Sequence, residues 1–322
     1  MLRKIDWERQ IGRRLKLRDL HVFLTVTQCS SMGKAAAQLG VSPPTVSEVI
    51  ADLEHALGVK LLDRSAQGVE PTIYGQALLR RGVVAFDELK QGIRDIEFLS
   101  DPTTGELRIG CSEPVSAAVL PPILDQFLQK YPRVVVHVND VPPPTREMSG
   151  LRERKHDLIL NRLVAPISRD PLGDDLNVEV LFDDPLVVAA GVHTRWPRRR
   201  KIDLAELIDE PWILAPADTW NYACVAEAFH ARGLAMPKVR MLTLSVTLRT
   251  HLLANGPYIA AFAKSVLRLK ADRYALKALP IDLPSRPSPI VIVTLKNRTL
   301  SPIVERFIAS AREVVKPLAS RN

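Results

Sequence analysis

Cysteine is scarce in this 322-residue chain, and its sequence contains no long apolar run. The three cysteines, Cys29, Cys111 and Cys224, are odd in number and widely spaced, so they predict neither a disulfide scaffold nor a zinc site. Uncharged apolar stretches such as residues 186–192 are far shorter than the ~20 residues that a membrane-spanning helix requires. The basic N-terminus has neither an apolar core nor a small-residue cleavage site, which argues against a secretory signal. We therefore expect a protein of the reducing cytosol with no membrane segment.

The composition is otherwise that of a globular protein. Hydrophobic residues make up 46% and charged residues 25%, and the length suggests about two domains of ~150 residues each. The net charge of +8 permits a polyanionic partner without requiring one. Residues 1–34 carry eight basic groups against three acidic ones, and a second basic run spans residues 195–201. We interpret the second run as a solvated surface loop, so charge alone locates no DNA site.

The first hundred residues place apolar side chains at helical spacing, which predicts helices over 32–39 and 43–57. Ser31 and Ser42 are suitable N-caps for these helices, and Gly40 ends the first of them. Short strands are predicted at 61–62 and 69–70. A long helix follows, from Thr72 to about Leu99.

The long helix repeats its apolar residues at spacings of three and four over more than three heptads. This pattern is typical of a helix that packs on another helix. Burial against its own chain is the alternative, but no nearby helix of matching length is predicted. We therefore favour a dimer helix.

Residues 31–50 have the pattern of a helix-turn-helix, in which two helices cross through a short turn. The small side chain of Ala36 lets the two backbones approach, and Gly40 can adopt a positive φ in the turn. An ordinary helical hairpin is the alternative, although chance helix pairs usually fail one of these requirements. The residues expected to fill the angle between the helices are Val41, Val46 and Val49.

If this segment reads DNA, the first turn of the second helix enters the major groove. The helix has no Lys or Arg, so strong guanine readout is not expected from it. Phosphate contacts must then come from Lys34, Lys60, Arg64 and the basic N-terminal arm. The outward side chains at the start of the helix are Ser42, Pro43, Pro44, Thr45, Ser47 and Glu48.

After a linker at 101–105, strands and helices alternate, which predicts α/β units with a mostly parallel sheet, and the length of this part favours two lobes. The predicted strands are 107–111, 134–138, 157–161, 185–190, 212–214 and 289–295. The predicted helices are 115–131, 145–155, 221–232, 246–255 and 302–315.

A set of motif residues connects the helix-turn-helix to the start of the long helix. It comprises Leu20, Phe23, Ser31, Met32, Lys34, Ala35, Ala36, Leu39, Ser42, Pro44, Val46, Ser47, Ile50, Leu53, Glu54, Leu57, Gly58, Leu61, Leu62, Arg64, Pro71, Thr72 and Gly75. Together these residues resemble the N-terminal signature of LysR-type transcriptional regulators. The resemblance runs from residue 20 to residue 75 without a gap, and the order of the remaining parts agrees over nearly the whole chain.

The resemblance implies a winged helix-turn-helix, a linker helix that forms dimers, and a two-lobed, periplasmic-binding-protein-like effector domain. It also implies a homodimer or homotetramer that binds inverted repeats in double-stranded promoter DNA in the cytoplasm, at the nucleoid, with RNA polymerase as a further partner. Transcription would be activated or repressed when a small inducer binds, such as an organic acid or a sugar. By position, the DNA contacts would be Ser42, Pro44, Thr45, Ser47 and Arg64, with Lys34 and Pro43 beside them.

Two features depart from the family pattern. Pro43 stands where the family often has glutamine, which removes a base-reading amide. A basic arm at residues 1–14 precedes the usual start, and we expect it to add phosphate contacts. We accordingly expect an α/β protein with this arm, a winged helix-turn-helix domain at 15–72, a linker helix at 73–100 and an effector domain at 105–322. Lobe I would span about 105–180 and 281–318, and lobe II about 181–280.

In a two-lobed binding fold the ligand lies between the lobes, at strand C-termini and helix N-termini, where free amides favour anions or polar oxygens. Arg162 is placed there and can pair with a carboxylate. For each candidate, a role as a helix cap or turn residue is an equal alternative. The candidates are Ser112, Pro114, Val115, Asn161, Arg162, Asp218, Thr219 and Phe262.

Catalytic and metal-binding patterns are missing from the sequence. The segment 111–113 (Cys-Ser-Glu) has no recognisably placed histidine, and there is no Gly-x-Ser-x-Gly elbow, phosphate-binding loop or paired metal-ligand spacing. We therefore expect neither an enzyme nor a cofactor.

Two rival interpretations of the whole chain remain. One is a cytosolic small-molecule-binding α/β protein whose helical N-terminus only dimerises it, without a specific DNA target; the other is an enzyme that acts on an organic acid in the lobe cleft.

Overall fold

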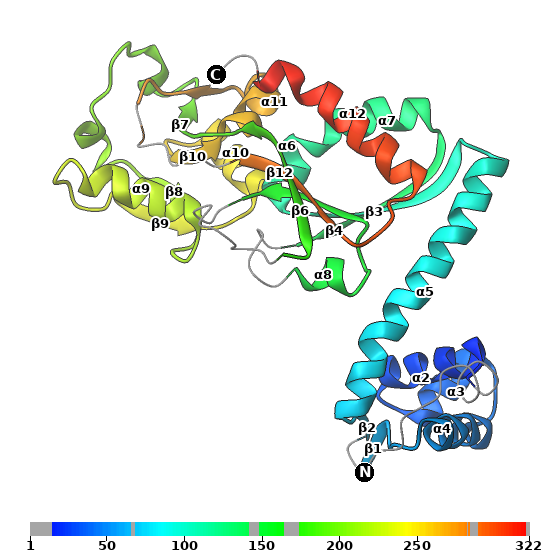
Figure 1. Cartoon of the computed structure of the whole chain (residues 1–322). Coiled ribbons are helices and arrows are strands. Elements are labelled where there is room, and N and C mark those ends of the chain that lie inside the picture. The colour runs from blue at the N-terminus through cyan, green and yellow to red at the C-terminus, as the bar shows by residue number, and fades with distance from the viewer. Residues whose placement is uncertain are drawn as a thin grey trace. The chain divides into compact units, whose positions relative to one another are not determined.

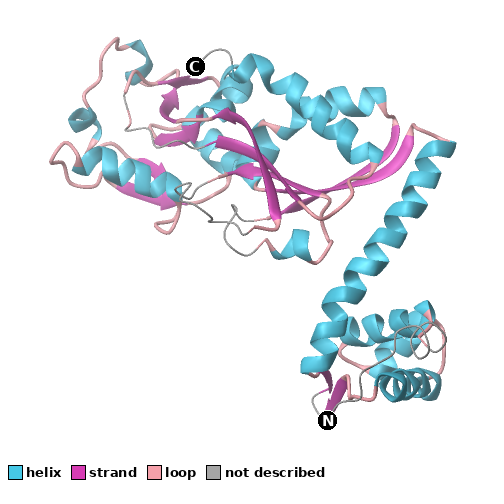
Figure 2. Ribbon diagram, viewed as in Figure 1, coloured by secondary structure: helices cyan, strands magenta, loops and turns pink. Residues whose placement is uncertain are grey.

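The computed structural model describes residues 15–319, apart from 66–67, 142–147, 164–173, 282 and 284–288. The basic arm expected at 1–14 lies outside these described residues. The chain forms two compact units, Met1–Gly92 and Ile93–Asn322. Helix α5 (Ile73–Ser100) begins in the first unit and ends in the second (Figure 1). Figure 2 shows a mainly helical first unit and a second unit in which helices surround long strands.

The first unit packs short helices and a hairpin around one apolar core. Helices α2 (Leu17–Cys29), α3 (Met32–Leu39) and α4 (Pro43–Leu57) precede strands β1 (Leu62–Ser65) and β2 (Gly68–Pro71), which pair antiparallel. Phe23, Val46 and Ile50 are fully buried in this core. Leu78 and Phe86 of α5 pack against it, so the first part of α5 completes the unit.

Local sequence explains where these helices begin and end. The side chains of Ser31 and Ser42 each accept a hydrogen bond at 3.4 Å from the amide three residues ahead, so each caps the helix that follows. Gly40 (φ 65°) and Gly58 (φ 70°) end α3 and α4 in the left-handed conformation that favours glycine. The helices predicted over 32–39 and 43–57 are therefore confirmed.

The second unit contains two mixed sheets among its described residues. The strands of the first are β3 (Thr104–Cys111), β4 (Arg133–Asp140), β5 (Leu158–Arg162), β6 (Leu176–Asp183) and β12 (Pro289–Leu295). They lie in the order β4-β3-β5-β12-β6. Strand β3 pairs parallel with β4 and β5, whereas β12 pairs antiparallel with β5 and β6.

The second sheet is built from the intervening part of the chain. Its strands are β7 (Leu186–Gly191), β8 (Trp212–Leu214), β9 (Val239–Leu242), β10 (Ile259–Ala263) and β11 (Leu276–Ala278), in the order β11-β7-β10-β8-β9. Strand β8 pairs parallel with β9 and β10, whereas β7 pairs antiparallel with β10 and β11. The division between the sheets falls between β6 and β7.

Helices cover both sheets, and α7 and α12 lie side by side over the first one (Figure 1). The rings of Phe127 and Phe307 meet edge to face there, with centroids 5.4 Å apart. One buried apolar cluster includes these rings together with Ile109 of the first sheet and Phe262 of the second. The helices are α6 (Glu113–Ala118), α7 (Leu120–Lys130), α8 (Ser149–Arg152), α9 (Trp220–His230), α10 (Val246–Asn255), α11 (Lys264–Tyr274), α12 (Pro302–Ala319) and the 3₁₀ turns η2 (Trp196–Arg198) and η3 (Leu204–Leu207).

The expectation of a mostly parallel sheet is wrong, because parallel and antiparallel pairings occur in both sheets. The physical reason is that strand direction is set by distant partners and not by the local pattern. Strand β12, for example, is buried along its whole length, and such an apolar run suits either direction.

Two predicted helices also differ from the structure. The helix expected over 115–131 is divided into α6 and α7, because Pro121 and Pro122 lack the amide N–H that would continue α6 and instead begin a new helix. The helix expected over 145–155 is reduced to α8 within the described residues, and Arg154 follows it with a positive φ of 60° that ends the helical path. None of the helices in the described part of the chain has the length and apolar character needed to cross a membrane.

Candidate DNA interface and effector site

The residues predicted to read bases lie at the N-terminus of α4. Ser42 caps the helix, and Pro43 and Pro44 occupy its first positions, where no amide donor is needed. The hydroxyls of Ser42 and Thr45 lie 2.8 Å apart and hydrogen-bond to each other. Ser42, Pro43 and Pro44 are exposed, whereas Thr45 and Ser47 are half-buried. This turn therefore offers hydroxyl groups and apolar carbons to a partner.

The crossing of α3 and α4 fixes the angle at which that turn is presented. Ala36 is 1% exposed, and its carbonyl accepts the Val41 amide at 3.0 Å across the turn made by Gly40. Val46 of α4 is fully buried in the same core. Val41 and Val49, expected to fill the angle as well, are only half-buried at its edge. The buried crossing holds α4 rigidly within the first unit.

The hairpin β1–β2 forms the wing and carries Arg64. Arg64 is exposed and lies opposite Val69 in the hairpin register. The Val69 amide donates to the Ser30 carbonyl at 3.0 Å, which ties the hairpin to the end of α2. Gly68 permits this approach, because a Cβ there would lie 2.8 Å from the Ser30 oxygen. The wing is therefore fixed to the helices on one side.

Glu54 is a buried carboxylate of α4 that holds the wing on the other side. Its Oε1 accepts the amides of Leu61 and Leu62 at 2.8 and 3.2 Å, and its Oε2 accepts Lys60 Nζ at 2.6 Å. Burial alone would raise the pKa of Glu54, but these hydrogen bonds more than offset burial and lower it. Sequence reasoning assigned Glu54 no role, although a charged residue inside an apolar helical stripe was a usable signal.

The cations expected to contact phosphate differ in whether the protein itself pairs their charge. Lys34 on α3 and Arg64 on the wing are exposed. The Lys60 side chain is 77% exposed, but its ammonium forms a salt bridge with Glu54. Part of its charge is therefore neutralised by the protein, which makes Lys34 and Arg64 the stronger candidates.

The first group of effector candidates lies where strands of the first sheet end. Ser112 follows β3, and Asn161 and Arg162 are the last residues of β5. The Ser112 hydroxyl donates to Asn161 Oδ1 at 2.6 Å, and the same oxygen accepts the Arg162 amide at 2.8 Å. Ser112 is 7% exposed and Asn161 is fully buried. The structure therefore brings these three residues together at one edge of the sheet.

Arg162 is already engaged with a carboxylate of the chain itself. Its Nη1 donates to the Asp184 carbonyl and its Nη2 to Asp184 Oδ2, both at 2.5 Å. The same carboxylate accepts the amide and the hydroxyl of Ser265 at 2.8 and 2.7 Å. The Arg162 guanidinium also lies over the ring of Trp220, 5.2 Å from its centroid. An effector carboxylate would have to compete with Asp184 for this group.

The start of α6 faces α10. Pro114 is half-buried and Val115 is 1% exposed. The Val115 amide, expected to be free for a ligand, donates instead to the Ser112 carbonyl at 3.0 Å. Glu113 Oε1 accepts the Val246 amide at the start of α10, also at 3.0 Å. Internal hydrogen bonds therefore occupy part of the expected anion-binding surface.

Arg249 of α10 is a buried cation that sequence reasoning missed. It is 2% exposed and donates to the carbonyls of Ala261 and Leu244 at 2.9 and 3.3 Å. Burial lowers its pKa to about 10, against the opposite influence of the Glu113 carboxylate. The guanidinium therefore remains charged at neutral pH. One arginine in a helix looks like a surface residue in the sequence, so the pattern carried no usable signal.

The remaining effector candidates divide between surface and core. The Thr219 hydroxyl caps α9 and donates to the Pro216 carbonyl at 2.6 Å. Asp218 beside it is exposed. Phe262 on β10 is 1% exposed, and the Arg249 guanidinium lies 4.8 Å from its ring centroid. Thr219 thus serves as a cap, and Phe262 belongs to the core.

The catalytic interpretation of residues 111–113 gains no support from the geometry. Burial raises the pKa of the Cys111 thiol to about 12, and Asp140 adds to the shift, so the thiol is protonated at neutral pH. No group of three or more His, Cys, Asp or Glu side chains in the described ranges is arranged to hold a metal ion.

Two surface pockets of about 500 and 520 Å³ lie elsewhere in the second unit. One is lined by residues 193–196 and 255–257 together with Glu210, and the other by residues 201–204 and 279–281 together with Arg232. Neither shares a residue with the predicted effector set.

A helix-turn-helix with a hairpin wing, joined through one helix to an α/β unit with two sheets, defines a DNA-binding regulator that carries a ligand-binding domain. The family described as "Bacterial regulatory helix-turn-helix protein, lysR family" matches residues 17–76, and "LysR substrate binding domain" matches residues 100–316. The chain belongs to the LysR family of transcriptional regulators, which confirms the family predicted from the sequence.

One relative and two solved structures each match more than nine-tenths of the chain. The transcriptional regulator GbpR of Azospirillum brasilense is 26% identical over 303 residues, which cover 93% of this chain and 86% of GbpR. CbnR in complex with its target DNA has a TM-score of 0.59 at 21% identity and covers 93% of this chain and 100% of CbnR. Full-length OxyR from Pseudomonas aeruginosa has a TM-score of 0.59 at 19% identity and covers 94% of this chain and 95% of OxyR. These structures share the fold.

Proposed function

We propose that this protein is an inducer-responsive regulator that binds inverted repeats in promoter DNA and activates or represses transcription when a small metabolite binds its second unit. The observation that carries the proposal is the N-terminus of α4, where exposed side chains stand on a helix held by a buried crossing. A helix presented in this way fits the major groove end-on.

Base contacts in this proposal come from the hydroxyls of Ser42, Thr45 and Ser47, and Pro43 and Pro44 pack against thymine methyl groups. Phosphate contacts come from Lys34, from Arg64 and from the basic arm before residue 15. Because α4 has no Lys or Arg, specificity rests on hydroxyl and apolar contacts and on DNA shape.

The effector in this proposal is an organic acid or a sugar bound near Ser112, Asn161 and Thr219, whose hydroxyl and amide groups suit polar oxygens. Arg162 joins the site only when the ligand displaces Asp184 from its guanidinium. Of the other predicted side chains, we propose Pro114 and Asp218 beside the ligand, because they are not buried, whereas Val115 and Phe262 support the site from the core.

We infer a homodimer through α5, with a homotetramer as the larger assembly. Leu89, Ile93, Ile96 and Leu99 are 46%, 58%, 65% and 80% exposed, and their spacing of three and four puts them on one helix face. A continuous exposed apolar stripe of this kind is typical of a helix that packs on another helix. In this proposal the regulator acts in the cytoplasm at the nucleoid, with RNA polymerase as a further partner.

The experiment that tests this function is selection of genomic fragments by the purified protein at near-physiological salt, followed by sequencing. We expect an interrupted inverted repeat whose half-sites lie about one or a few helical turns of ~10 bp apart. Retention that is salt-sensitive and independent of sequence would contradict the proposal, because positive charge alone would then explain DNA binding. The neighbouring genes would in turn nominate the inducer.

A further inference from the structure

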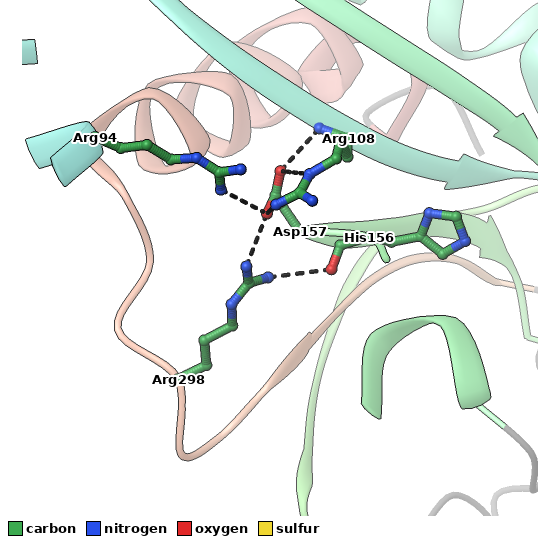
Figure 3. A network of polar contacts seen from close by, with 5 residues as sticks. All are labelled: Arg94, Arg108, His156, Asp157 and Arg298. Atoms are coloured by element: carbon green, nitrogen blue, oxygen red, sulfur yellow. Dashed lines mark hydrogen bonds and ion pairs between the residues drawn. The ribbon is translucent and has the colours of Figure 1, made fainter. Parts of the chain in front are cut away.

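Asp157, which immediately precedes β5, is surrounded by guanidinium groups from Arg94, Arg108 and Arg298 (Figure 3). Arg108 of β3 donates its backbone amide to Oδ2 at 2.9 Å and its Nη2 to Oδ1 at 3.2 Å. Arg298, in the turn after β12, donates Nη2 to Oδ1 at 2.9 Å. Arg94 of α5 approaches the same oxygen with Nη1 at 3.7 Å. One carboxylate thus faces cations from two parts of the sheet and from the helix.

The members of this cluster differ in how firmly they are held. The side chains of Asp157 and Arg298 are each 1% exposed, and Arg298 also donates to the His156 carbonyl at 3.1 Å. The side chains of Arg94 and Arg108 are 19% and 25% exposed. Arg94 makes the longest contact and comes from the helix. Arg94 is therefore the member of the cluster that lies on neither the sheet nor the turn after β12.

The end of α5 has further attachments in the second unit. Phe98 packs against the main core of that unit. Asp101, directly after the helix, forms an ion pair with Arg133 of β4, and Thr103 accepts Arg133 Nε at 3.0 Å. The same helix packs its first turns into the core of the first unit. Any change in how its last turns are held therefore acts on a helix that also belongs to the DNA-binding unit.

The strands that carry the cluster also lead to the candidate effector site. Arg108 lies on β3, which ends just before Ser112, and Asp157 directly precedes β5, which contains Asn161 near its end. A ligand that moves Ser112 or Asn161 along the strand direction would therefore move Arg108 and Asp157 as well. The two strands are parallel neighbours, so they would shift together.

We propose that Arg94 and Asp157 form a releasable joint through which the effector site controls the last turns of α5. The inference rests on the proposed regulatory function and identifies positioning residues that couple its two sites. Repulsion among three guanidinium groups weakens the hold on Arg94, while Arg108 and Arg298 suffice to satisfy the buried carboxylate. We assign the release to Arg94 because its contact with Asp157, at 3.7 Å, is the longest of the three.

The test compares amide hydrogen exchange in the full-length protein and its variants without DNA. In Arg94→Gln we expect residues 93–100 to exchange about three- to tenfold faster, because one charged contact of the helix is lost. Arg94→Lys keeps the charge and should retain most of the protection. Lys90→Gln removes an exposed charge one turn away and should leave exchange unchanged. Unchanged exchange in Arg94→Gln would overturn the joint.

A second measurement separates coupling from mere structural support. The bend angle of a selected operator fragment, measured by gel mobility of circularly permuted DNA, should change in Arg94→Gln and be restored in Arg94→Lys, while affinity for one half-site stays within about twofold. Faster amide exchange in Arg94→Gln with an unaltered DNA bend angle would contradict the proposal, because Arg94 would then only stabilise the end of the helix. Failure of the wild-type protein to select any operator would count against the proposed function, and the exchange measurement would still decide whether Arg94 holds the helix.

Discussion

At the scale of single residues, two buried ionisable groups, one in each unit, contribute to the dependence of stability on pH. The pKa of Glu54 is lowered from 4.5 by hydrogen bonds that more than offset burial, and the pKa of His156 is lowered from 6.5, mainly by burial. In both cases the unfolded chain binds the proton more readily. Stability therefore falls on acidification, beginning below pH 6.5 for His156 and below pH 4.5 for Glu54.

Replacement of Glu54 should destabilise the first unit. Glu54→Ala leaves the amides of Leu61 and Leu62 without their acceptor, so we expect a loss of about 1–3 kcal/mol in the free energy of unfolding. Urea denaturation measures this loss. Glu48→Ala, an exposed carboxylate on the same helix, is the matched control and should change little. Equal stability of the two variants would show that Glu54 does not hold the wing.

Replacement of His156 should flatten the acid dependence of stability. Its imidazole is 7% exposed and packs against Gly150, so protonation is disfavoured in the folded state. Between pH 7.5 and 5.5 the wild-type protein should lose more stability than His156→Gln, as measured by urea midpoints at each pH. The exposed residue His251 provides the control through His251→Gln. If both variants lose as much stability as the wild type, His156 does not contribute to the acid response.

At the scale of elements, α5 contains two glycines, Gly75 and Gly92, whose surroundings differ. A Cβ at Gly75 would lie 2.0 Å from the carbonyl oxygen of Leu61, the residue before β1, so only glycine fits at this point of the helix. A Cβ at Gly92 would meet no other atom within 4 Å. Gly75 therefore has a packing role, and Gly92 weakens the helix without a steric reason.

This contrast predicts opposite effects of the same substitution. Gly75→Ala should lower the free energy of unfolding by about 1–3 kcal/mol through overpacking. Gly92→Ala should raise it by about 0.5–1 kcal/mol, because alanine loses less backbone entropy in a helix. Thermal denaturation of both variants measures the difference. The same sign of change in both would refute this interpretation of the helix.

The elements that sequence predicted well are those whose ends are marked locally. Caps and glycines set α3 and α4, and the spans 246–255 and 289–295 agree with α10 and β12 residue for residue. Strand β6 was missed although residues 176–180 alternate apolar and polar side chains, which is a strand signal, whereas α11 has no comparably clear apolar face. Strand direction was also beyond local pattern, because it depends on partners far along the chain.

In the candidate site, too, the features that depend on residues far apart in the chain could not be predicted. The placement of Ser112 and Asn161 at neighbouring strand ends follows from the order of strands and helices. The partner of Arg162 could not be predicted, because Asp184 lies 22 residues away in a turn between the two sheets. The Asp157 cluster joins residues separated by 49 and 141 positions, and only the fold brings them together.

At the scale of the whole molecule, the exposed face of α5 predicts the assembly. Ile96→Glu places a charge in the middle of the apolar stripe, so we expect dissociation towards a monomer with unchanged helical content. Sedimentation velocity measures the change in mass. Lys90→Glu, which alters charge at an exposed position of the same helix, should leave the assembly intact. An Ile96→Glu protein with the wild-type mass would place the interface elsewhere.

The central claim is that α4 reads DNA sequence, and the ratio of two affinities tests it most directly. Binding of a selected inverted repeat and of a scrambled duplex of equal composition is compared at near-physiological salt, for the wild-type protein and for Ser47→Glu. The wild type should prefer the repeat by on the order of a thousandfold or more. Ser47→Glu should lose that preference with little change in melting temperature, because the new carboxylate would face DNA phosphates. Equal affinity of the wild type for both duplexes, or an undiminished preference in Ser47→Glu, would contradict the claim.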